Sequence, residues 1–242
     1  MRIAALYDIH GNLPALEAVL AAARRERVDQ IVVGGDVFPG PQSSRVLEVL
    51  LALDLPVQYL RGNGDREILA LAAGEEPAAL PERYRAAMRW EAERLSAEHR
   101  RIVAAWPGLL QLGDVCFCHA TPHSDSAIFT RLTPEERLLP VFDGSGASTV
   151  VCGHTHMQFD RKVGTVRVIN AGSVGMPFGA AGAYWLLLGR EPELRRTDYD
   201  LAAAAARIRA CGHPGAEEFA ARYVLNPPTE QEMLAAFAPA GP

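Results

Sequence analysis

The 242-residue sequence lacks the features that mark membrane-spanning and polyanion-coating proteins. It contains no apolar run that approaches the length of a membrane span, and its first apolar run, Ile3–Tyr7, is too short for the core of a signal peptide. Its net charge of −5 argues against a protein that coats nucleic acid, because such proteins are usually basic. We therefore expect a cytoplasmic protein with no membrane partner and no non-specific nucleic-acid binding, although a nucleic-acid substrate engaged locally is compatible with this charge.

Cysteine and lysine are both scarce. The four cysteines have no spacing typical of a disulfide framework or a zinc site. Cys116 and Cys118 alternate along a predicted strand and should face the same side of it, and all the cysteines are expected to be small buried residues in a reducing compartment. Of the 24 basic residues only Lys162 is a lysine, a bias that carries no information about function.

The first half of the chain alternates predicted strands and helices. The composition, 49% apolar and 22% charged, and the length suit one large α/β domain or two small ones. Apolar runs predict strands over 3–7, 30–33 and 57–60, and helical spacing predicts helices over 13–25 and 43–53. Strands separated by single helices indicate parallel βαβ units.

Residues 66–105 are predicted to be helical, with an interruption from Gly74 to Pro81, and are the expected insertion or cap. Ser96 is the expected N-cap of the segment that runs to Trp106. After Pro107-Gly108 the pattern changes to a hairpin, because Gly113-Asp114 separates two short apolar runs, 109–112 and 115–118.

The remainder of the chain is predicted to contain short strands and then helices. A capping box that begins at Thr133 predicts a helix over 134–142. The further predicted strands are 149–152, 159–163, 165–169, 184–188 and 194–199. The closing helices are expected near 201–210, 216–224 and 230–237, the last behind a capping box from Thr229 to Glu232. We expect one domain over 1–200 and a helical appendage over 201–242.

Polar side chains follow directly after five of the predicted strands. These residues are Asp8, His10, Asp36, Asn63, His119, His154 and His156. Ligands bind at the carboxyl ends of the strands in open α/β sheets, so these residues are candidates for one site. Mixed carboxylate and imidazole ligands suit first-row metals better than Ca²⁺ or Mg²⁺. Seven such groups exceed what one tetrahedral ion needs, but they suit two ions that share a bridging carboxylate.

Glycines precede three of these candidate ligands. Gly35, Gly62 and Gly153 are expected to allow tight or positive-φ turns that direct the next side chain into the site. The helix after Asn12 would add the positive end of its dipole, which favours an anion.

The order of these motifs resembles that of the calcineurin-like metallophosphoesterases. The motifs are Asp-x-His, Gly-Asp, Gly-Asn, a histidine at a strand end and Gly-His-x-His. Asp8-Ile9-His10-Gly11-Asn12 and the later segment Asn170-Ala171-Gly172-Ser173-Val174-Gly175 are similar to the small prokaryotic branch of that superfamily. The resemblance covers roughly residues 1–190, and the helices past 200 fall outside it. It implies an α/β fold, a four-layer α-β-β-α sandwich of two mixed sheets flanked by helices.

The resemblance also implies a dinuclear metal site. Asp8, His10 and His156 would hold one ion and Asn63, His119 and His154 the other, with Asp36 as the bridge. Asp36, Asn63 and His119 are the expected catalytic residues. The implied cofactors are two divalent transition-metal ions, Mn²⁺ first, with Fe, Ni, Co or Zn as alternatives. The implied reaction is hydrolysis of a phosphoester by in-line attack of a hydroxide that bridges the ions.

One position departs from the pattern of the superfamily. Many members have a histidine directly after the motif asparagine, placed to protonate the leaving oxygen, and here that position is Gly64. The general acid is therefore not identified, and a leaving group that is already acidic would need one least. His123 could serve as the general acid in place of the missing histidine, or it could be a surface histidine. We expect that it takes no part in catalysis, although it could line the pocket.

The expected substrate-binding residues are Asn12, Asp65, Arg66 and His123. Each has an alternative. Asn12 and Asn170 could instead orient loops or metal ligands through hydrogen bonds. Arg66 could cap a helix instead of contacting a phosphate.

The function that fits these residues is a metal-dependent phosphoesterase with a preference for phosphodiester or nucleotide-type substrates. The alternatives are a phosphomonoesterase, including a phosphoprotein phosphatase, and a catalytically weak metal-binding scaffold. The retromer scaffold subunit shares this fold, but a pure scaffold has little physical reason to keep a full set of ligands. The sequence does not identify the native metal, the physiological substrate or the oligomeric state.

Overall fold

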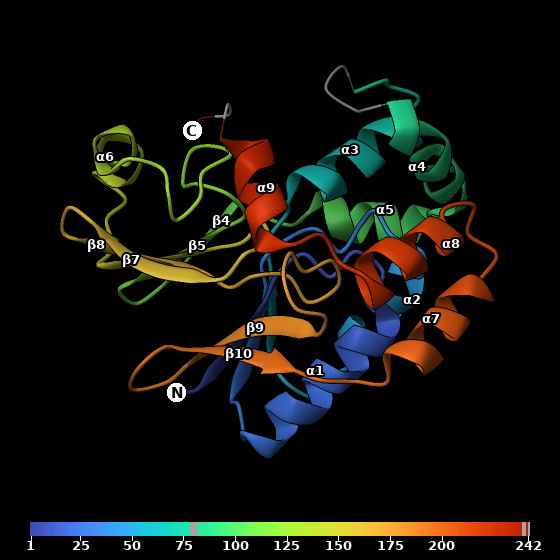
Figure 1. Ribbon diagram of the computed structural model, residues 1–242, viewed down its shortest axis with the longest axis horizontal. Coiled ribbons are helices and arrows are strands. Elements are labelled where there is room, and N and C mark those ends of the chain that lie inside the picture. The colour runs from blue at the N-terminus through green and yellow to red at the C-terminus, as the bar shows by residue number, and fades with distance from the viewer. Residues whose placement is uncertain (78–81, 239–240, 242) are drawn as a thin grey trace.

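Two five-stranded sheets lie face to face, and helices cover their outer faces (Figure 1). The computed structural model describes residues 1–77, 82–238 and 241. In Figure 1 the order of layers from top to bottom at the left and centre is α6, one sheet, the other sheet and α1. The predicted four-layer sandwich of two mixed sheets is confirmed.

The first sheet contains the strands of the predicted βαβ units. Its order is β10-β9-β1-β2-β3, with β1, β2 and β3 parallel and β9 antiparallel to both β1 and β10. The strands are β1 (Ile3–Leu6), β2 (Gln30–Val33), β3 (Val57–Tyr59), β9 (Ala183–Leu188) and β10 (Glu193–Thr197). Because β9 pairs with β1, the end of the sandwich domain closes onto its beginning.

The second sheet is built from the middle of the chain. Its order is β4-β5-β6-β8-β7, in which β5, β6 and β8 are parallel and the two outer strands are antiparallel to their neighbours. The strands are β4 (Leu109–Leu112), β5 (Val115–Cys118), β6 (Thr149–Cys152), β7 (Phe159–Val163) and β8 (Val166–Asn170). The Gly113-Asp114 hairpin between β4 and β5 is as predicted.

The alternation of side chains along the strands separates the hydrophobic layers. On β1, Ile3 and Ala5 face the second sheet and pack in a core that also contains Phe117 and Ile169. Leu6, which points the other way, belongs to the core beneath the helices of the first sheet. Cys116, Cys118 and Cys152 share one side of the second sheet with Phe129 and Phe142, and all the described cysteines are free thiols.

Local sequence signals explain where several helices begin. In α1 (Leu13–Arg25), Asn12 accepts a hydrogen bond from Ala15 N–H, as expected of an N-cap. In α5 (Ala97–Ala104), Ser96 accepts from His99 N–H in the same way. The neighbouring helices are α2 (Ser43–Leu51), α3 (Asn63–Ala72) and α4 (Glu82–Arg94). Part of the predicted interruption, residues 78–81, lies outside the described residues.

Two helix predictions need correction. The predicted capping box at Thr133 does not form, because the Thr133 hydroxyl accepts from Thr130 N–H instead, and α6 (Glu135–Phe142) begins after Pro134. The predicted helix 216–224 is α8 (Ala216–Phe219) followed by a π-helical stretch, Ala220–Leu225.

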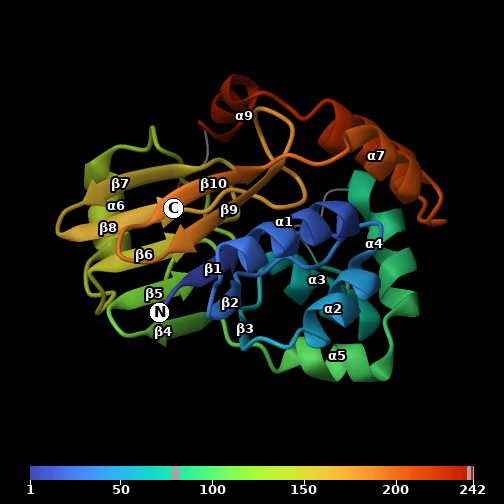
Figure 2. The same ribbon diagram turned by 90° about the horizontal axis from the view of Figure 1, so that it is seen from below.

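The C-terminal helices form a hydrophobic cluster of their own. The helix α7 (Leu201–Arg209) lies beside α1 (Figure 2), and the Arg207 guanidinium pairs with Glu17 at 2.6 Å. Ile208, Phe219 and Tyr223 are buried in this cluster. The last helix, α9 (Glu230–Phe237), begins with the predicted capping box. None of the described helices combines the length and hydrophobicity that crossing a membrane requires.

Candidate metal centre

The candidate ligands come from the ends of strands in both sheets. Asp8 and Asp36 follow β1 and β2 of the first sheet, whereas His119 and His154 follow β5 and β6 of the second. Asn63 is the first residue of α3. The two sheets thus present their polar strand ends to each other, and all seven predicted ligands lie in one region.

One group of potential ligands consists of Asp8, His10 and His156. His156 Nε2 lies 3.4 Å from Asp8 Oδ1, and the Nε2 atoms of His10 and His156 are 3.3 Å apart. All three residues are buried, and one ligand atom of each lies within 4.8 Å of the others.

The second group consists of Asp8, Asp36 and His119, with the same spacing of ligand atoms. His119 Nε2 lies 3.5 Å from Asp36 Oδ2 and 3.8 Å from Asp8 Oδ1. Asp36 Oδ2 is also 3.7 Å from His10 Nε2, so its carboxylate lies between the two groups. The resemblance implied that Asp36 would be the shared ligand, whereas the residue common to both groups in the structure is Asp8.

Asn63 and His154 adjoin the second group. The Asn63 side-chain amide lies 3.0 Å from His154 Nδ1 and 3.3 Å from His119 Nε2. The rings of His119 and His154 are 5.2 Å apart.

A divalent cation fits this arrangement of donors. Asp8 Oδ1 is buried and has no hydrogen-bond partner among the described residues. A buried carboxylate oxygen without a partner is costly, and a cation is one way to satisfy it. Carboxylate, imidazole and amide ligands together suit a borderline first-row metal.

Backbone carbonyls orient three of the histidines. The Nδ1 atoms of His10, His119 and His156 lie 3.0, 2.9 and 2.6 Å from the carbonyl oxygens of Pro39, Gly34 and Met176, respectively. Each contact leaves Nε2 directed toward the ligand cluster, as is usual for histidines that bind metals. These partners could not be predicted from the sequence, because every residue carries a backbone carbonyl group.

The ligands themselves adopt the left-handed backbone conformation. The φ angles of Asp8, His10, Asp36, His154 and His156 are 52°, 45°, 53°, 65° and 57°, values that non-glycine residues rarely adopt. Of the three preceding glycines, which were expected to allow tight or positive-φ turns, Gly35 has a positive φ of 99°, whereas Gly62 and Gly153 do not have positive φ. Gly153 is needed for close approach instead, since a Cβ there would lie 2.5 Å from Asp8 Oδ2. Strain of this kind clusters at functional sites.

The carboxylates and imidazoles shift one another's pKa values. Burial disfavours the charged form of Asp36, but His119 and His10 outweigh it and hold the pKa of Asp36 below its usual range. Burial also disfavours charged His119, but Asp36 and Asp8 prevail and raise the pKa of His119 to about 10. Burial, and then the charge on His119, lowers the pKa of His154 to about 4. At neutral pH the two carboxylates therefore face one protonated imidazole, His119, and a divalent cation would replace this proton as the compensating charge.

The position after Asn63 has no room for a side chain. A Cβ on Gly64 would lie 2.4 Å from the carbonyl oxygen of Phe38, closer than real Cβ contacts. The Gly64 N–H donates to Asp36 Oδ1 at 2.8 Å. The histidine that many relatives carry here could not be accommodated unless the Phe38 segment moved.

Two of the predicted substrate contacts serve the fold instead. Asn12 is fully buried, caps α1 and donates to the carbonyl oxygen of Gly175 at 2.9 Å. Asp65 is fully buried and accepts from the N–H groups of Asp36, Phe38 and Gly62. Burial, and then the charge on Asp36, raises the pKa of Asp65 to about 7. Both side chains are fully buried and bonded to the backbone, which argues against direct contact with a substrate.

The other two candidates lie on the surface. The Arg66 guanidinium pairs with the Asp125 carboxylate through hydrogen bonds of 2.7 and 3.1 Å, so it caps no helix terminus in this conformation. His123 is exposed, as expected of a surface histidine.

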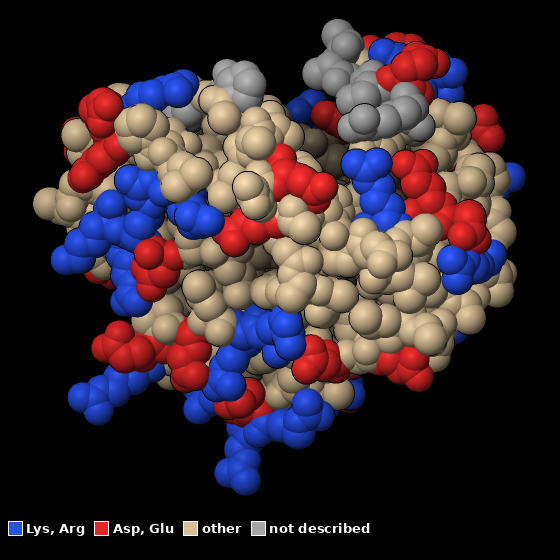
Figure 3. Space-filling view, viewed as in Figure 1, with Lys and Arg blue, Asp and Glu red and all other residues tan. Residues whose placement is uncertain are grey.

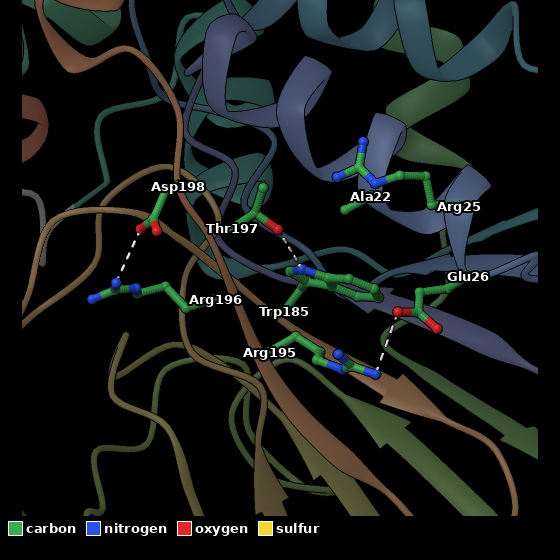
Figure 4. A pocket seen from close by; sticks show the side chains of 8 residues that line it. All are labelled: Ala22, Arg25, Glu26, Trp185, Arg195, Arg196, Thr197 and Asp198. Atoms are coloured by element: carbon green, nitrogen blue, oxygen red, sulfur yellow. Dashed lines mark hydrogen bonds and ion pairs between the residues drawn. The ribbon is translucent and has the colours of Figure 1, made fainter.

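A separate hollow of about 280 Å³ lies between α1 and β10 (Figure 4). Two of its arginines are paired: Arg195 with Glu26 at 3.4 Å and Arg196 with Asp198 at 3.0 Å. It contains none of the candidate ligands. On the face seen in Figure 3, basic side chains gather over the β7–β8 hairpin, with acidic side chains beside them.

The comparison with protein families agrees with the motifs. A family model described as the calcineurin-like phosphoesterase superfamily domain matches residues 1–191. This chain belongs to the calcineurin-like phosphoesterase superfamily. The resemblance inferred from the sequence is thereby confirmed, and hydrolysis of phosphoesters is the activity this membership supports. No curated protein matches the chain in sequence.

Solved structures resemble this superfamily member over nearly its whole length. A metallophosphoesterase from Sphaerobacter thermophilus is 26% identical, with a TM-score of 0.73 over 94% of this chain and 100% of that one. The hypothetical protein PH1004 from Pyrococcus horikoshii OT3 is 19% identical, with a TM-score of 0.76 over 94% and 99%. A cold-active protein tyrosine phosphatase is 17% identical, with a TM-score of 0.55 over 80% and 78%, and shares the fold.

Proposed function

We propose that this protein hydrolyses phosphoester bonds with two divalent transition-metal ions and prefers phosphodiester or nucleotide-type substrates. The observation that carries the proposal is the convergence of buried carboxylates and imidazoles around an Asp8 oxygen that has no hydrogen-bond partner in the described part of the chain. Membership of a phosphoesterase superfamily supports the same chemistry. A cytoplasmic location stays a prediction.

In this proposal each residue has one task. Asp8, His10 and His156 hold one ion, Asn63, His119 and His154 hold the other, and Asp36 contacts both. When bound, two such ions polarise a phosphoryl oxygen and lower the pKa of a water molecule between them. Asp65 contributes indirectly, because its carboxylate holds the backbone that carries Asp36.

The substrate preference rests on the position of Gly64. Because the space beside Phe38 excludes a side chain there, the chain lacks the histidine that would protonate a leaving oxygen. A substrate whose leaving group is already acidic depends least on such a donor. An aryl ester, or a nucleotide-type substrate whose leaving group is a pyrophosphate, is therefore favoured over an alkyl monoester.

Hydrolysis of paired nitrophenyl mono- and diesters tests the proposal. The protein is treated with a chelator, and Mn, Ni, Co, Zn and Mg are then added back singly. Turnover restored by a metal and faster on the diester is expected, whereas a faster monoester would favour the phosphomonoesterase alternative. Stoichiometric metal binding without turnover would favour the scaffold, and absence of metal binding would refute the proposal.

Substitution of Asp36 tests the shared ligand. Asp36→Asn should abolish binding of at least one ion, because it removes the carboxylate that lies between the two ligand groups. Metal content by atomic emission, with His123→Ala as the control, measures this. His123→Ala should keep its full metal content and turnover within a few-fold, whereas a fall of about 100-fold would identify His123 as the general acid.

A further inference from the structure

A buried pair of ionisable side chains, Glu91 and His213, supports the loop that follows β2. Glu91, on α4, has both carboxylate oxygens 3.0 Å from the backbone nitrogen of Gly40. His213 Nε2 lies 3.1 Å from Glu91 Oε1, and His213 Nδ1 accepts from Gly215 N–H at 3.0 Å. Since Nδ1 is an acceptor, Nε2 carries the proton that is donated to Glu91. The side chains of Glu91 and His213 are only 6% and 5% exposed, so the contact is largely shielded from bulk water.

The residue that Glu91 holds is packed directly against a candidate ligand. A Cβ on Gly40 would lie 1.9 Å from the carbonyl oxygen of His10, so the two backbones are in the closest possible contact. The residue before Gly40 is Pro39, whose carbonyl oxygen lies 3.0 Å from His10 Nδ1. His10 N–H donates to the carbonyl of Asp36 in the same loop. Movement of Gly40 would therefore shift both the backbone and the ring partner of His10.

His213 belongs to the C-terminal helical segment, beyond the residues that match the superfamily. It lies between α7 and α8, and its ring meets the edge of Trp90 on α4 at 5.3 Å. Close by, the Cys211 thiol donates to the carbonyl oxygen of Pro41 at 3.4 Å. The segment thus contacts the 39–41 loop directly through Cys211 and indirectly through the contact of His213 with Glu91.

The same segment supports the other histidine of that ligand group. The Phe178 ring stacks on His156 at 4.8 Å, and Phe178 and Met176 pack against the cluster formed by the C-terminal helices. The Met176 carbonyl is the one that orients His156. His119, in contrast, is oriented by Gly34, at the end of β2. The C-terminal helices therefore support one side of the candidate centre.

We propose that Glu91 and His213 are positioning residues for His10, and that through them the C-terminal helices set the affinity of the cation held by Asp8, His10 and His156. The inference rests on the proposed metal centre. Removal of a group that orients a metal-binding histidine typically weakens binding by about 10- to 100-fold. The ion on the side of Asn63, His119 and His154 should be insensitive to the pair.

Calorimetric titration of the full chain with Mn²⁺ after chelation tests this positioning role. Each titration uses a variant that lacks one ligand of one ion, so that binding of the other ion is measured by itself. The Asn63→Ala substitution weakens binding of the second ion. In this background, His213→Ala should lower the affinity for the remaining ion about 10-fold or more. In a His10→Ala background, the same change should alter the remaining affinity by less than about twofold, as expected of independent sites.

The matched control lies on the same helical segment. Arg209→Ala breaks an exposed pair with Glu217 and faces neither α4 nor the loop, so it should change neither affinity. Glu91→Gln keeps the shape of the side chain and gives a second measurement if His213→Ala does not fold. Glu91→Gln should lower the affinity for the same ion by a smaller factor, because its side-chain oxygen can still accept a hydrogen bond from either Gly40 or His213.

The outcomes separate this inference from the proposed function. Equal weakening in both backgrounds would indicate a general loss of structure and would overturn the inference, as would no change in either. If the wild-type chain bound no Mn²⁺, the metal centre itself would be refuted, and the positioning role with it. Two ions bound by the wild type, with unchanged affinities in the His213 and Glu91 variants, would refute the positioning role alone.

Discussion

At the scale of single residues, the candidate centre depends on backbone conformations that non-glycine residues rarely adopt. Asp8, Asp36 and His154 each follow a strand, and each has a positive φ. The sequence predicts the convergence of these residues but does not show their positive φ. Nor could it show that Asp65 is a support for the backbone, because an aspartate near a site is equally suited to bind a ligand until its three N–H partners are seen.

Gly64 gives a prediction about stability. Gly64→Ala should lower the free energy of unfolding by about 1–3 kcal/mol, because the added Cβ meets the carbonyl oxygen of Phe38 at 2.4 Å. Urea denaturation measures this. Gly108→Ala is the control, because a Cβ there meets nothing within 4 Å. Equal stabilities for the two variants would show that the Phe38 segment moves easily and that the absence of histidine needs another explanation.

His119 gives a prediction about pH. Asp36 and Asp8 raise its pKa to about 10, so without a bound cation this imidazole is protonated at neutral pH. Metal binding requires the neutral ring and must therefore release this proton, so affinity should rise about tenfold per pH unit between about pH 7 and 9. Calorimetry in two buffers of different ionisation enthalpy counts the protons released. His154, with its pKa lowered to about 4, is already neutral and contributes none. Binding that released no proton at pH 7 would contradict this account.

At the scale of helices and strands, local signals predicted most boundaries correctly. The strands β1, β2 and β6 and the N-caps at Asn12 and Ser96 follow from runs of apolar residues and from single capping side chains. Thr133 shows the limit of such signals. Its hydroxyl could bond either forward into the helix or back to Thr130, and the fold of the preceding loop decides between them.

The Ser96 cap can be tested directly. Ser96→Ala should lower the free energy of unfolding by about 1 kcal/mol, because the N–H of His99 loses its acceptor. Thermal or urea denaturation measures the change. Ser44→Ala is a suitable comparison, because the Ser44 hydroxyl bonds to none of the described residues. An unchanged free energy of unfolding in Ser96→Ala would mean that water satisfies the His99 N–H as well as the Ser96 hydroxyl does.

At the scale of the whole molecule, the proposed cations join the two sheets. Ligands follow β1 and β2 in one sheet and β5 and β6 in the other, so occupancy should stabilise the sandwich itself. Addition of Mn²⁺ to chelated protein at about 100 times its dissociation constant should stabilise the fold by about 2.7 kcal/mol per ion. The melting temperature measures this, and the Asp36→Asn variant should respond less. An unchanged melting temperature would show that the ions do not bind the folded state preferentially.

The separation of the ligands along the chain also has a consequence for synthesis. Asp8 and His10 leave the ribosome first, but His156 follows almost 150 residues later, and β9, which pairs with β1, later still. His213, which supports the loop beside His10, is made after all of these residues. A nascent chain therefore carries scattered ligands without their partners, and selection among competing metals in the cell is left to the finished fold.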